Sequence, residues 1–435
     1  MRFRDVDKSF VKRLDGHNVN ATFGGDPEFF IADENGEVMA SDKIFPGKEK
    51  PIGFKGVDCY NGKEKDCDNL KLFFDGIQAE MNIGIQRCRE YVADNIRICI
   101  TRALGIMGRK DKTYKILLEP SVEVSKEVIE GADPEARRFG CMPDFNAYTL
   151  TTNTSEIDAT NHPYRYAGGH IHLGVSSPYL KKSSGEYKMA KTEEGHIRII
   201  KLLDLLVGIP CAILDDSKGA IIRRYEYGKS GCFRPTPYGI EYRTPSCWWI
   251  KSPITVSLIL GLARLAWTIA ASYSDTNMDE QLFKLIKYEP EDIKGICDES
   301  DKKEAIKVWD TLKAYLALIG KQSSNPVHIK NFRSNGIYTH RFDAMSGKKP
   351  KFYDRNGIVI DEEKIDSFTP VFPFMVFEYL AKNGLSSIIS DNIKKEWSIG
   401  RKFNNCLGFI SGTHSELSIN KDFLAFQKSM LKEIF

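Results

Sequence analysis

The chain has 435 residues, of which 42% are hydrophobic and 28% are charged, a composition ordinary for a folded, water-soluble protein. The 62 Lys and Arg against 59 Asp and Glu leave a formal net charge of +3, too small to indicate nucleic acid or a membrane surface as a partner. The first residues, MRFRDVDKSFVKRLDGH, contain no apolar signal region, and the 10 cysteines show no CxxC or zinc-ligand spacing. We therefore expect a cytoplasmic protein with free thiols.

The predicted elements alternate between strands and helices without a regular βαβ pattern. A hairpin is predicted over residues 22–41, with its turn at Asn35-Gly36. Further strands are predicted over residues 70–83, 114–124, 168–175 and 238–246. Helices are predicted over residues 86–107, 193–215 (interrupted at Pro210), 254–271, 279–288 and 302–320. A further hairpin is expected within 348–363, with more helix to the end. This order favours an α+β fold with a mostly antiparallel sheet.

The apolar segment ITVSLILGLARLAWTIAA, residues 254–271, is long enough to be considered for a membrane span. It carries Arg264 near its middle and follows a polar loop that contains proline. Because an arginine in the middle of a bilayer is costly, the sequence favours a buried helix over a membrane-spanning one.

Four predicted strands carry polar residues two positions apart, which places both side chains on one face. In RYAGGHIHLGV the pair is His170 and His172, with the apolar neighbours facing the other way. The other pairs are Asp26 with Glu28 in GGDPEFF, Glu80 with Asn82 in QAEMNI, and Glu241 with Arg243 in IEYR. One such pair alone is equally typical of a solvated sheet face or of a satisfied core histidine.

The residue types in these four pairs narrow the interpretation. Carboxylates, imidazoles and an arginine are present, and lysine is absent. Several carboxylates on one face repel one another unless a cation lies between them. Asp, Glu and His together form a plausible ligand set for Mg²⁺ or Mn²⁺. The sequence therefore indicates a divalent-metal site on one face of the sheet.

Residues 221–243 supply an unusual number of arginines together with glycines. The arginines are Arg223, Arg224, Arg234 and Arg243. Arginine forks bind phosphate and carboxylate groups, and glycines allow a close backbone approach. The same segment contains Gly228-Lys229-Ser230, but a P-loop needs a glycine five residues earlier, where Arg223 stands. We therefore expect a phosphoryl-transfer site in which the sheet face itself holds a nucleotide.

Four segments of the sequence resemble motifs of a known family. The segments GGDPEFF, DGIQAEMN, RYAGGHIHLG and RRYEYGKSGCFRPTPYGIEYRTPS are similar to motifs of the phage-type carboxylate–amine ligases, type 2 branch. That branch belongs to the glutamine synthetase and glutamate–cysteine ligase superfamily. The resemblance covers roughly residues 22–250 and implies a glutamine synthetase-like curved antiparallel sheet with helices on its convex side. ATP and two or three divalent ions, Mg²⁺ or Mn²⁺, would lie on the concave face.

The resemblance also implies roles for the matching residues. The implied metal ligands are Asp26, Glu28, Glu80, His170 and Glu241. The residues implied for the nucleotide phosphates are His172, Arg224 and Arg234. The residues implied for catalysis are Glu241, Arg243 and Arg234, and those for substrate are Arg165, Asn82 and Asp144. Asp26 stands where many relatives have glutamate. Aspartate has a shorter side chain, which affects the geometry at one metal, but the carboxylate charge is the same. The segment around Asp144 has a second interpretation of equal weight, in which it forms a capped turn around Pro143 and does not line the substrate pocket.

The implied reaction is ATP-dependent amide formation through an acyl phosphate, with ADP and phosphate released. The implied domains are a ligase core over residues 1–275 and a mostly helical C-terminal region over residues 276–435. An amino acid, a peptide tail or a polyamine could serve as substrate, and a homo-oligomer is a further expectation. If a phage encodes the chain, the reaction would take place in the cytoplasm of the bacterial host.

Three other protein classes share part of this residue pattern. A metal-dependent amidohydrolase also uses His-x-His, but it would leave the IEYR motif unexplained. A guanidino kinase builds its nucleotide site mainly from arginines, which the carboxylate–histidine set argues against. A degenerate family member that binds nucleotide or serves as a virion or host-interaction protein remains the alternative outside catalysis.

Overall fold

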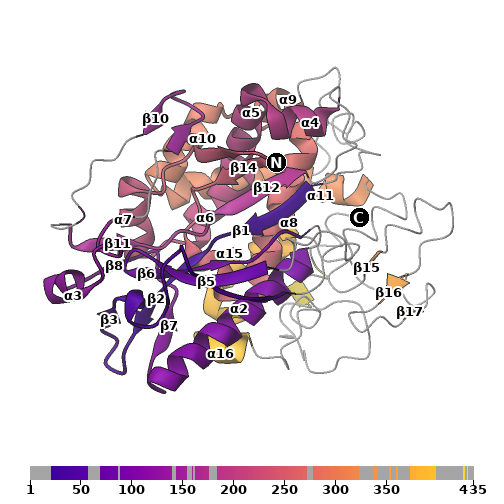
Figure 1. The fold of residues 1–435 in the computed structure, drawn as a ribbon. Helices are drawn as coiled ribbons and strands as arrows, with labels where there is room; N and C mark the ends of the chain where they lie inside the picture. The colour runs from indigo at the N-terminus through magenta and orange to yellow at the C-terminus, as the bar shows by residue number, and fades with distance from the viewer. Residues whose placement is uncertain are drawn as a thin grey trace. The chain divides into compact units, whose positions relative to one another are not determined.

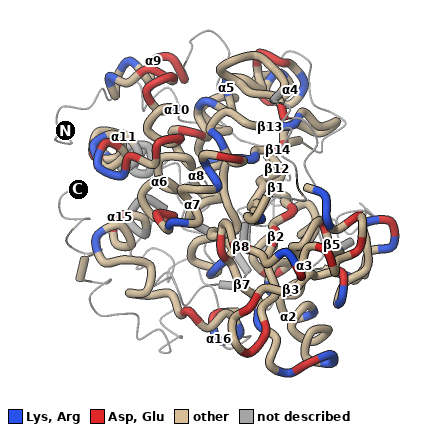
Figure 2. Tube along the Cα trace, turned by 90° about the vertical axis from the view of Figure 1, so that its left-hand side faces the viewer, with Lys and Arg blue, Asp and Glu red and all other residues tan. Residues whose placement is uncertain are grey.

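The computed structural model describes residues 21–56, 69–86, 89–139, 144–153, 159, 162–175, 184–271, 278–322, 338–339, 352–353, 359–360, 373–397, 425–426 and 429 (Figure 1). The chain forms two compact units, of which one is Val19–Ile306 and the other includes Lys307–Phe435. All the predicted site residues belong to the first unit. Along the described trace, Lys and Arg are interspersed with Asp and Glu (Figure 2), in keeping with the small net charge.

Two antiparallel sheets organise the first unit. One has the strand order β1 (Ala21–Gly25), β12 (Ile171–Val175), β14 (Gly239–Tyr242), β13 (Cys232–Thr236), β9 (Asp144–Asn146) and β10 (Thr152–Asn153). The other has the order β3 (Val38–Met39), β2 (Glu28–Ala32), β6 (Gln78–Asn82), β5 (Asn69–Asp75) and β4 (Ile52–Lys55), and β7 (Lys115–Leu117) also pairs with β2. β11 (Tyr164–Tyr166) and β8 (Ser121–Glu123) form a separate pair.

The two larger sheets are joined where β1 ends and β2 begins. Phe23 of β1 forms a bridge with Gln86, which follows β6, and the Ile83 amide donates to the Gly25 carbonyl oxygen at 3.1 Å. The Met81 amide of β6 donates to the Pro27 carbonyl oxygen at 3.0 Å. The backbone pairing thus continues across the junction as one curled antiparallel surface, and Asp26 lies at the junction. The α+β class with a mostly antiparallel sheet is confirmed.

The strand register separates a polar face from an apolar one. His172 lies opposite Glu241, and Glu241 lies opposite Arg234 on its other side. The next residue in each strand faces away from this row, as Leu173 opposite Ile240 shows, and both are fully buried. Because strand side chains alternate between faces, the two-residue spacing seen in the sequence becomes a polar row across three strands.

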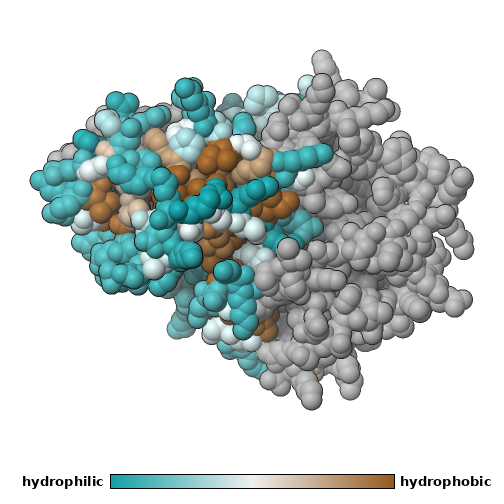
Figure 3. Space-filling model, turned by 60° about the horizontal axis from the view of Figure 1, so that its bottom comes forward, coloured by the Kyte–Doolittle hydropathy of each residue, from teal (hydrophilic) through white to brown (hydrophobic). Residues whose placement is uncertain are grey.

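Helices cover the apolar face. The helices in contact with these strands are α2 (Arg89–Lys110), α4 (Gly185–Lys191), α5 (Glu193–Leu203) and α8 (Pro253–Ala271). By length and composition alone, α8 could cross a membrane, but 76% of its most apolar window is buried inside the structure. This burial matches the core helix predicted for residues 254–271. On the face drawn in Figure 3, patches of hydrophobic residues are bordered by hydrophilic ones.

Glycine and proline residues mark the places where the observed elements differ from the predicted ones. The stretch predicted as one strand over 70–83 is a hairpin, because Gly76 adopts φ 76° in the turn after Asp75. The strand predicted over 114–124 is split into β7 and β8 near Pro120. Before Pro210 the predicted helix becomes a π-helical turn, η3 (Asp204–Gly208), and continues as α6 (Ile209–Leu214). Strand β13 was not predicted.

The remaining described elements are mostly helical. Those of the first unit are η2 (Ser41–Lys43), α3 (Lys126–Gly131), α7 (Lys218–Glu226), η4 (Cys247–Lys251), α9 (Met278–Ile286) and α10 (Pro290–Asp298), and α11 (Lys302–Gln322) begins there. The second unit contains β15 (Tyr338–Thr339), β16 (Phe352–Tyr353), β17 (Val359–Ile360), α15 (Pro373–Asn383), η5 (Leu385–Ser387) and α16 (Ile393–Glu396). Within the first unit, α10 packs against α6. The predicted domain boundary at residue 275 stays a prediction.

The glycine pair before the histidines permits a close approach that a larger residue would prevent. A Cβ atom at Gly169 would overlap the Ser246 carbonyl oxygen and the Trp249 indole nitrogen. We expect Gly169→Ala to lower the free energy of unfolding by about 1–3 kcal/mol, the usual cost of overpacking. Urea unfolding would measure this. Gly108→Ala is the control, because Gly108 lies in α2 with nothing near its Cβ position, and it should be neutral or stabilising.

Candidate functional site

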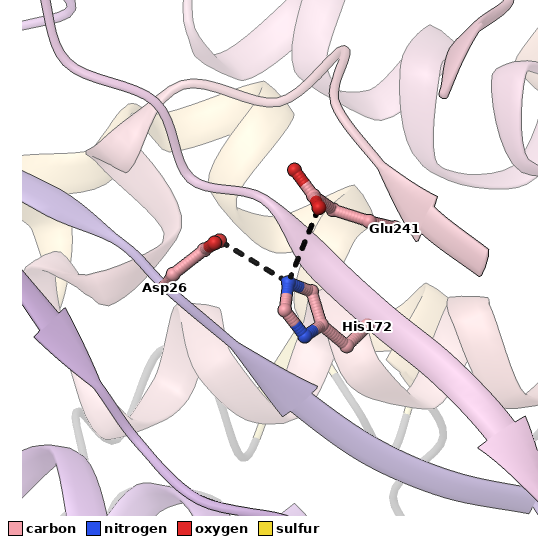
Figure 4. A group of neighbouring side chains, drawn as sticks. All are labelled: Asp26, His172 and Glu241. Atoms are coloured by element: carbon pink, nitrogen blue, oxygen red, sulfur yellow. Dashed lines mark ion pairs between the residues drawn. The ribbon is translucent and has the colours of Figure 1, made fainter. Parts of the chain in front are cut away.

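The first group of site residues lies where β1, β12 and β14 meet. Asp26 follows β1, His172 comes from β12 and Glu241 from β14, and all three side chains point to one place (Figure 4). His172 Nε2 lies 3.3 Å from Asp26 Oδ1 and 4.0 Å from Glu241 Oε2. His170 Nδ1 lies between the same two carboxylates, at 3.3 Å from Asp26 Oδ1 and 3.6 Å from Glu241 Oε1. The structure therefore brings four predicted residues together.

The donor set of this group fits a divalent cation. Asp26, His172 and Glu241 each offer one ligand atom, and these atoms lie within 4.8 Å of one another. Within the described part of the chain, Asp26 Oδ1 and His172 Nε2 are buried and have no hydrogen-bond partner. Buried polar atoms normally have such a partner, so unsatisfied oxygen and imidazole atoms that converge suit an ion between them.

Electrostatic interactions in this group shift the pKa values of the two histidines in opposite directions. Burial alone would raise the pKa of Asp26, but His172 and His170 hold it well below its usual range. Burial lowers the pKa of His172, and the charge of Asp26 raises it by more, so the net shift is upward. For His170, burial and the nearby charge of Arg243 lower the pKa. A neutral His170 can offer a lone pair, as a metal ligand must.

Two arginines complete the polar row next to Glu241. Arg234 Nη1 donates to Glu241 Oε2 at 3.0 Å, and Arg234 is partly exposed. Arg243 is buried, donates to Glu241 and to the Tyr227 hydroxyl, and places Nε 2.7 Å from Asp144 Oδ1. These neighbours outweigh the effect of burial and raise the pKa of Arg243. Arg234 is thus the more accessible guanidinium, whereas Arg243 is held on three sides.

A second carboxylate group lies on β2, β5 and β6. Glu28 pairs in register with Glu80, and ligand atoms of Glu28, Asp75 and Glu80 all lie within 4.8 Å of one another. Lys48 Nζ lies 3.6 Å from Asp75 Oδ2 and 4.0 Å from Glu80 Oε2. The same ammonium is 5.4 Å from the centre of the Phe73 ring.

Both glutamates of the second group are costly to charge. Burial, together with the charge of Asp75, raises the pKa of Glu28 to about 8. Burial and the charge of Asp26 raise the pKa of Glu80 well above its usual range. Since Asp26 belongs to the first group, the two groups are close enough to interact electrostatically. A cation bound here would stabilise the ionised carboxylates.

Neighbouring residues position His172. The Tyr238 hydroxyl lies 2.8 Å from His172 Nδ1, which leaves Nε2 to face Asp26 and Glu241. On β1, a Cβ at Gly24 would lie 3.6 Å from the His172 Cβ and 2.9 Å from the Gly84 carbonyl oxygen, so glycine admits the neighbouring chain.

Three predicted residues have other partners. Arg224 on α7 donates to the carbonyl oxygens of Cys211 and Asp215 and to the Ser300 hydroxyl, so it holds helices together. Arg165 donates to the carbonyl oxygens of His162, Tyr164 and Ala159 and is 1% exposed. Asn82 Oδ1 accepts the Gly84 amide. These contacts give no support to a phosphate role for Arg224 or a substrate role for Arg165.

Four residues near these groups were not predicted. They are Lys48, Asp75, Tyr227 and Tyr238. Asp75 shows a weak signal, since it directly precedes the turn glycine of a hairpin that also carries Glu80. Lys48 lies in FPGKEK, which has no periodicity that would direct its side chain. Of the rest of the predicted substrate segment, Cys141 and Pro143 lie outside the described residues.

Comparison with known proteins bears on this arrangement. Residues 186–311 match the family described as Phage phiEco32-like COOH.NH2 ligase-type 2. The predicted family is confirmed over this segment. The match to this COOH-NH2 ligase family supports a ligase activity in general. The matched segment contains Arg234, Glu241 and Arg243, whereas Asp26 and both histidines precede it. No curated protein matches the chain.

Within the segment matched to the COOH-NH2 ligase family, Asp204 is a fully buried carboxyl that accepts a 2.7 Å hydrogen bond from the Tyr242 hydroxyl. Burial raises the pKa of Asp204 to about 7. Between about pH 4 and pH 7 the unfolded chain loses this proton while the folded chain keeps it. Stability should therefore fall as the pH rises through that window, by up to about 4 kcal/mol from this group.

Asp204→Asn tests this pH dependence, because asparagine keeps an acceptor oxygen for Tyr242 and cannot ionise. Urea unfolding of both proteins between pH 4 and pH 8 would measure it. We expect the variant to gain stability relative to wild type as the pH rises. A constant difference across this range would show that Asp204 does not titrate as described.

Proposed function

We propose that the protein is an ATP-dependent carboxylate–amine ligase that forms an amide through an acyl phosphate. The observation that carries the proposal is the convergence of Asp26, His170, His172 and Glu241 beside Arg234 on one polar sheet face. Carboxylates and imidazoles that suit a divalent ion, next to a partly exposed arginine, form a setting for phosphoryl transfer. The family match supports the ligase class.

Mg²⁺ or Mn²⁺ would be held by Asp26, His172 and Glu241, whose ligand atoms converge. His172 would thus take the metal-binding role that the resemblance assigns to His170, and His170 would lie beside the ion. Such an ion supplies charge neutralisation to ATP phosphates when it is bound. Glu28 and Glu80 would contribute to a second ion, together with Asp75. Their buried carboxylates fit this role because a cation offsets the cost of their burial.

The chain's own residues would act on the phosphoryl group and the acid. The substrate carboxylate oxygen attacks the γ-phosphorus of ATP, and the bond from that phosphorus to the ADP oxygen breaks. Arg234 would bind the transferring phosphoryl oxygens, and Arg243, fixed by Asp144 and Tyr227, would keep Glu241 in place. The amine then attacks the acyl carbon, phosphate leaves with the bonding electron pair, and the amine loses a proton. Preorganised donors of this kind favour the charge that builds in transfer.

The substrates we propose are a carboxylic acid and a primary amine, such as an amino acid, a peptide tail or a polyamine. No nucleic acid or membrane partner is required by this chemistry. If the chain is phage-encoded, it would act in the cytoplasm of the bacterial host. A homo-oligomer would be compatible with the reaction.

Hydroxylamine tests the proposal without knowledge of the amine. It traps acyl phosphates as hydroxamates, which are assayed by colour with iron(III). The protein is incubated with ATP, Mg²⁺ and a panel of acids, and we expect hydroxamate and ADP in equal amounts with at least one acid. If ATP binds but no acid in a broad panel supports turnover, a nucleotide-binding protein without ligase activity replaces the proposal.

A further inference from the structure

The second carboxylate group already contains a cation of the chain itself. The Lys48 ammonium lies 3.6 Å from Asp75 Oδ2 and 4.0 Å from Glu80 Oε2, above the Phe73 ring. The Lys48 side chain is 62% exposed, whereas that of Glu80 is 7% exposed. A mostly solvated lysine therefore reaches from outside toward a buried carboxylate of the sheet.

Glu80 gives an independent reason to place a cation here. Glu80 is 5% exposed as a whole residue and pairs with Glu28 across the two strands. Its ion-pair partner is Lys48, whose Nζ lies 4.0 Å from Glu80 Oε2. A buried carboxylate is costly to charge, and an ion-pair contact at 4.0 Å offsets that cost only weakly. The group is therefore only partly neutralised.

We propose that Lys48 is a tethered counter-ion that competes with a divalent cation for the carboxylates of Glu28, Asp75 and Glu80. The ammonium occupies the mouth of the group before the ion binds and swings into solvent when the ion enters. Lys48 thereby sets the metal affinity of this group. This inference rests on the metal requirement of the proposed function, and it assigns a role to a residue outside the four sequence motifs.

The exposure of Lys48 limits the size of the effect. An exposed ion pair is worth little, so displacing the ammonium should weaken metal binding by roughly two- to fivefold. Removing the charge should therefore tighten binding by the same factor. Lys48→Met removes the charge and retains an unbranched stem above Phe73. Lys48→Arg retains the charge and should behave like wild type.

Calorimetric titration of the full chain with Mn²⁺, without nucleotide or substrate, tests the competition. We expect Lys48→Met to lower the Kd for Mn²⁺ at the group of Glu28, Asp75 and Glu80 by roughly two- to fivefold, and Lys48→Arg to leave it unchanged. Lys50→Ala is the matched control, since Lys50 is an exposed lysine two residues away. In an Asp75→Asn/Glu80→Gln background, Lys48→Met should have no effect on the remaining Mn²⁺ binding.

Several outcomes would overturn the inference. Equal Mn²⁺ affinity in wild type and Lys48→Met would refute it while leaving the ligase proposal intact. The same gain in both backgrounds would show a general charge effect. If n-butylammonium raises the melting temperature of Lys48→Met and Mn²⁺ does not, the group is an ammonium site instead. If neither protein binds Mn²⁺, the metal requirement of the proposed function also fails, and the hydroxamate assay decides the ligase activity separately.

Discussion

Glu241→Gln is expected to reduce hydroxamate formation by about a hundredfold or more with any acid that the wild type accepts. The substitution keeps the size of the side chain and removes its charge. Glu241 contacts both His170 and Arg234 in the structure and contributes one of three converging ligand atoms. Loss of its charge would weaken metal binding and release the arginines from their present positions. The rate is measured as hydroxamate formed per folded protein.

The same substitution should also lower the stability of the protein. Glu241 is 3% exposed and forms ion pairs with Arg234 and with the buried Arg243. Removing one partner of a buried pair is costly, although Arg243 keeps Asp144 and Tyr227. We therefore expect a loss of about 1–3 kcal/mol in the free energy of unfolding, which urea unfolding measures.

Glu123→Gln is the matched control for the loss of activity. Glu123 is an exposed strand glutamate on β8, so its substitution should leave the hydroxamate rate unchanged. Equal rates in wild type and Glu241→Gln would show that Glu241 has no part in the reaction. A drop that merely follows the folded fraction of Glu241→Gln would lead to the same conclusion.

The polar face of the sheet could be predicted because strand geometry is strict. Side chains two residues apart must share a face, so His170 with His172 and Glu241 with Arg243 could be placed from the sequence. These pairs form one site only if the strand register places them side by side. The pairing of His172 with Glu241 shows that it does. Apolar neighbours such as Leu173 made any other face costly, which is why the register is well determined.

Arginines could not be placed by the same reasoning. In a helix, Arg223 and Arg224 point in different directions, and only packing decides what each guanidinium meets. Arg224 donates hydrogen bonds to the carbonyl oxygens of Cys211 and Asp215 and does not reach the site. Arg223 donates to the carbonyl oxygens of Thr244 and Arg243. A buried arginine near carbonyl groups can satisfy structural needs as well as bind phosphate, and sequence composition does not distinguish the two.

Residues in loops were missed for a different reason. Lys48 reaches Glu80 from a loop whose path depends on the whole β4–β5 region, and a flexible stem can point in many directions. Tyr238 lies in the turn between β13 and β14, where no period applies. Its hydroxyl meets His172 only because the register brings that turn beside β12. Such contacts arise from tertiary packing.

Asp26→Asn and Arg234→Ala should separate the metal from the phosphates. Asp26 contacts both histidines at 3.3 Å and has a buried oxygen without a hydrogen-bond partner. Asparagine keeps the shape but removes the negative charge, so Asp26→Asn should raise the Kd for Mn²⁺ by about tenfold or more. Titration calorimetry without nucleotide measures this. The loss should be specific, because Asp26 lies in the first group of ligands.

Arg234→Ala should weaken the binding of ATP and not that of the metal. The Arg234 side chain is 29% exposed and its guanidinium donates to Glu241, so its removal takes a positive charge away from a metal ligand. Affinity for Mn²⁺ alone should stay the same or increase, while affinity for ATP in the presence of Mg²⁺ should fall by about tenfold. If Arg234→Ala weakens Mn²⁺ binding as much as Asp26→Asn does, the arginine supports the metal site structurally. Equal ATP affinity in wild type and Arg234→Ala would remove this residue from the nucleotide site, because a phosphate contact cannot be lost without a cost in binding.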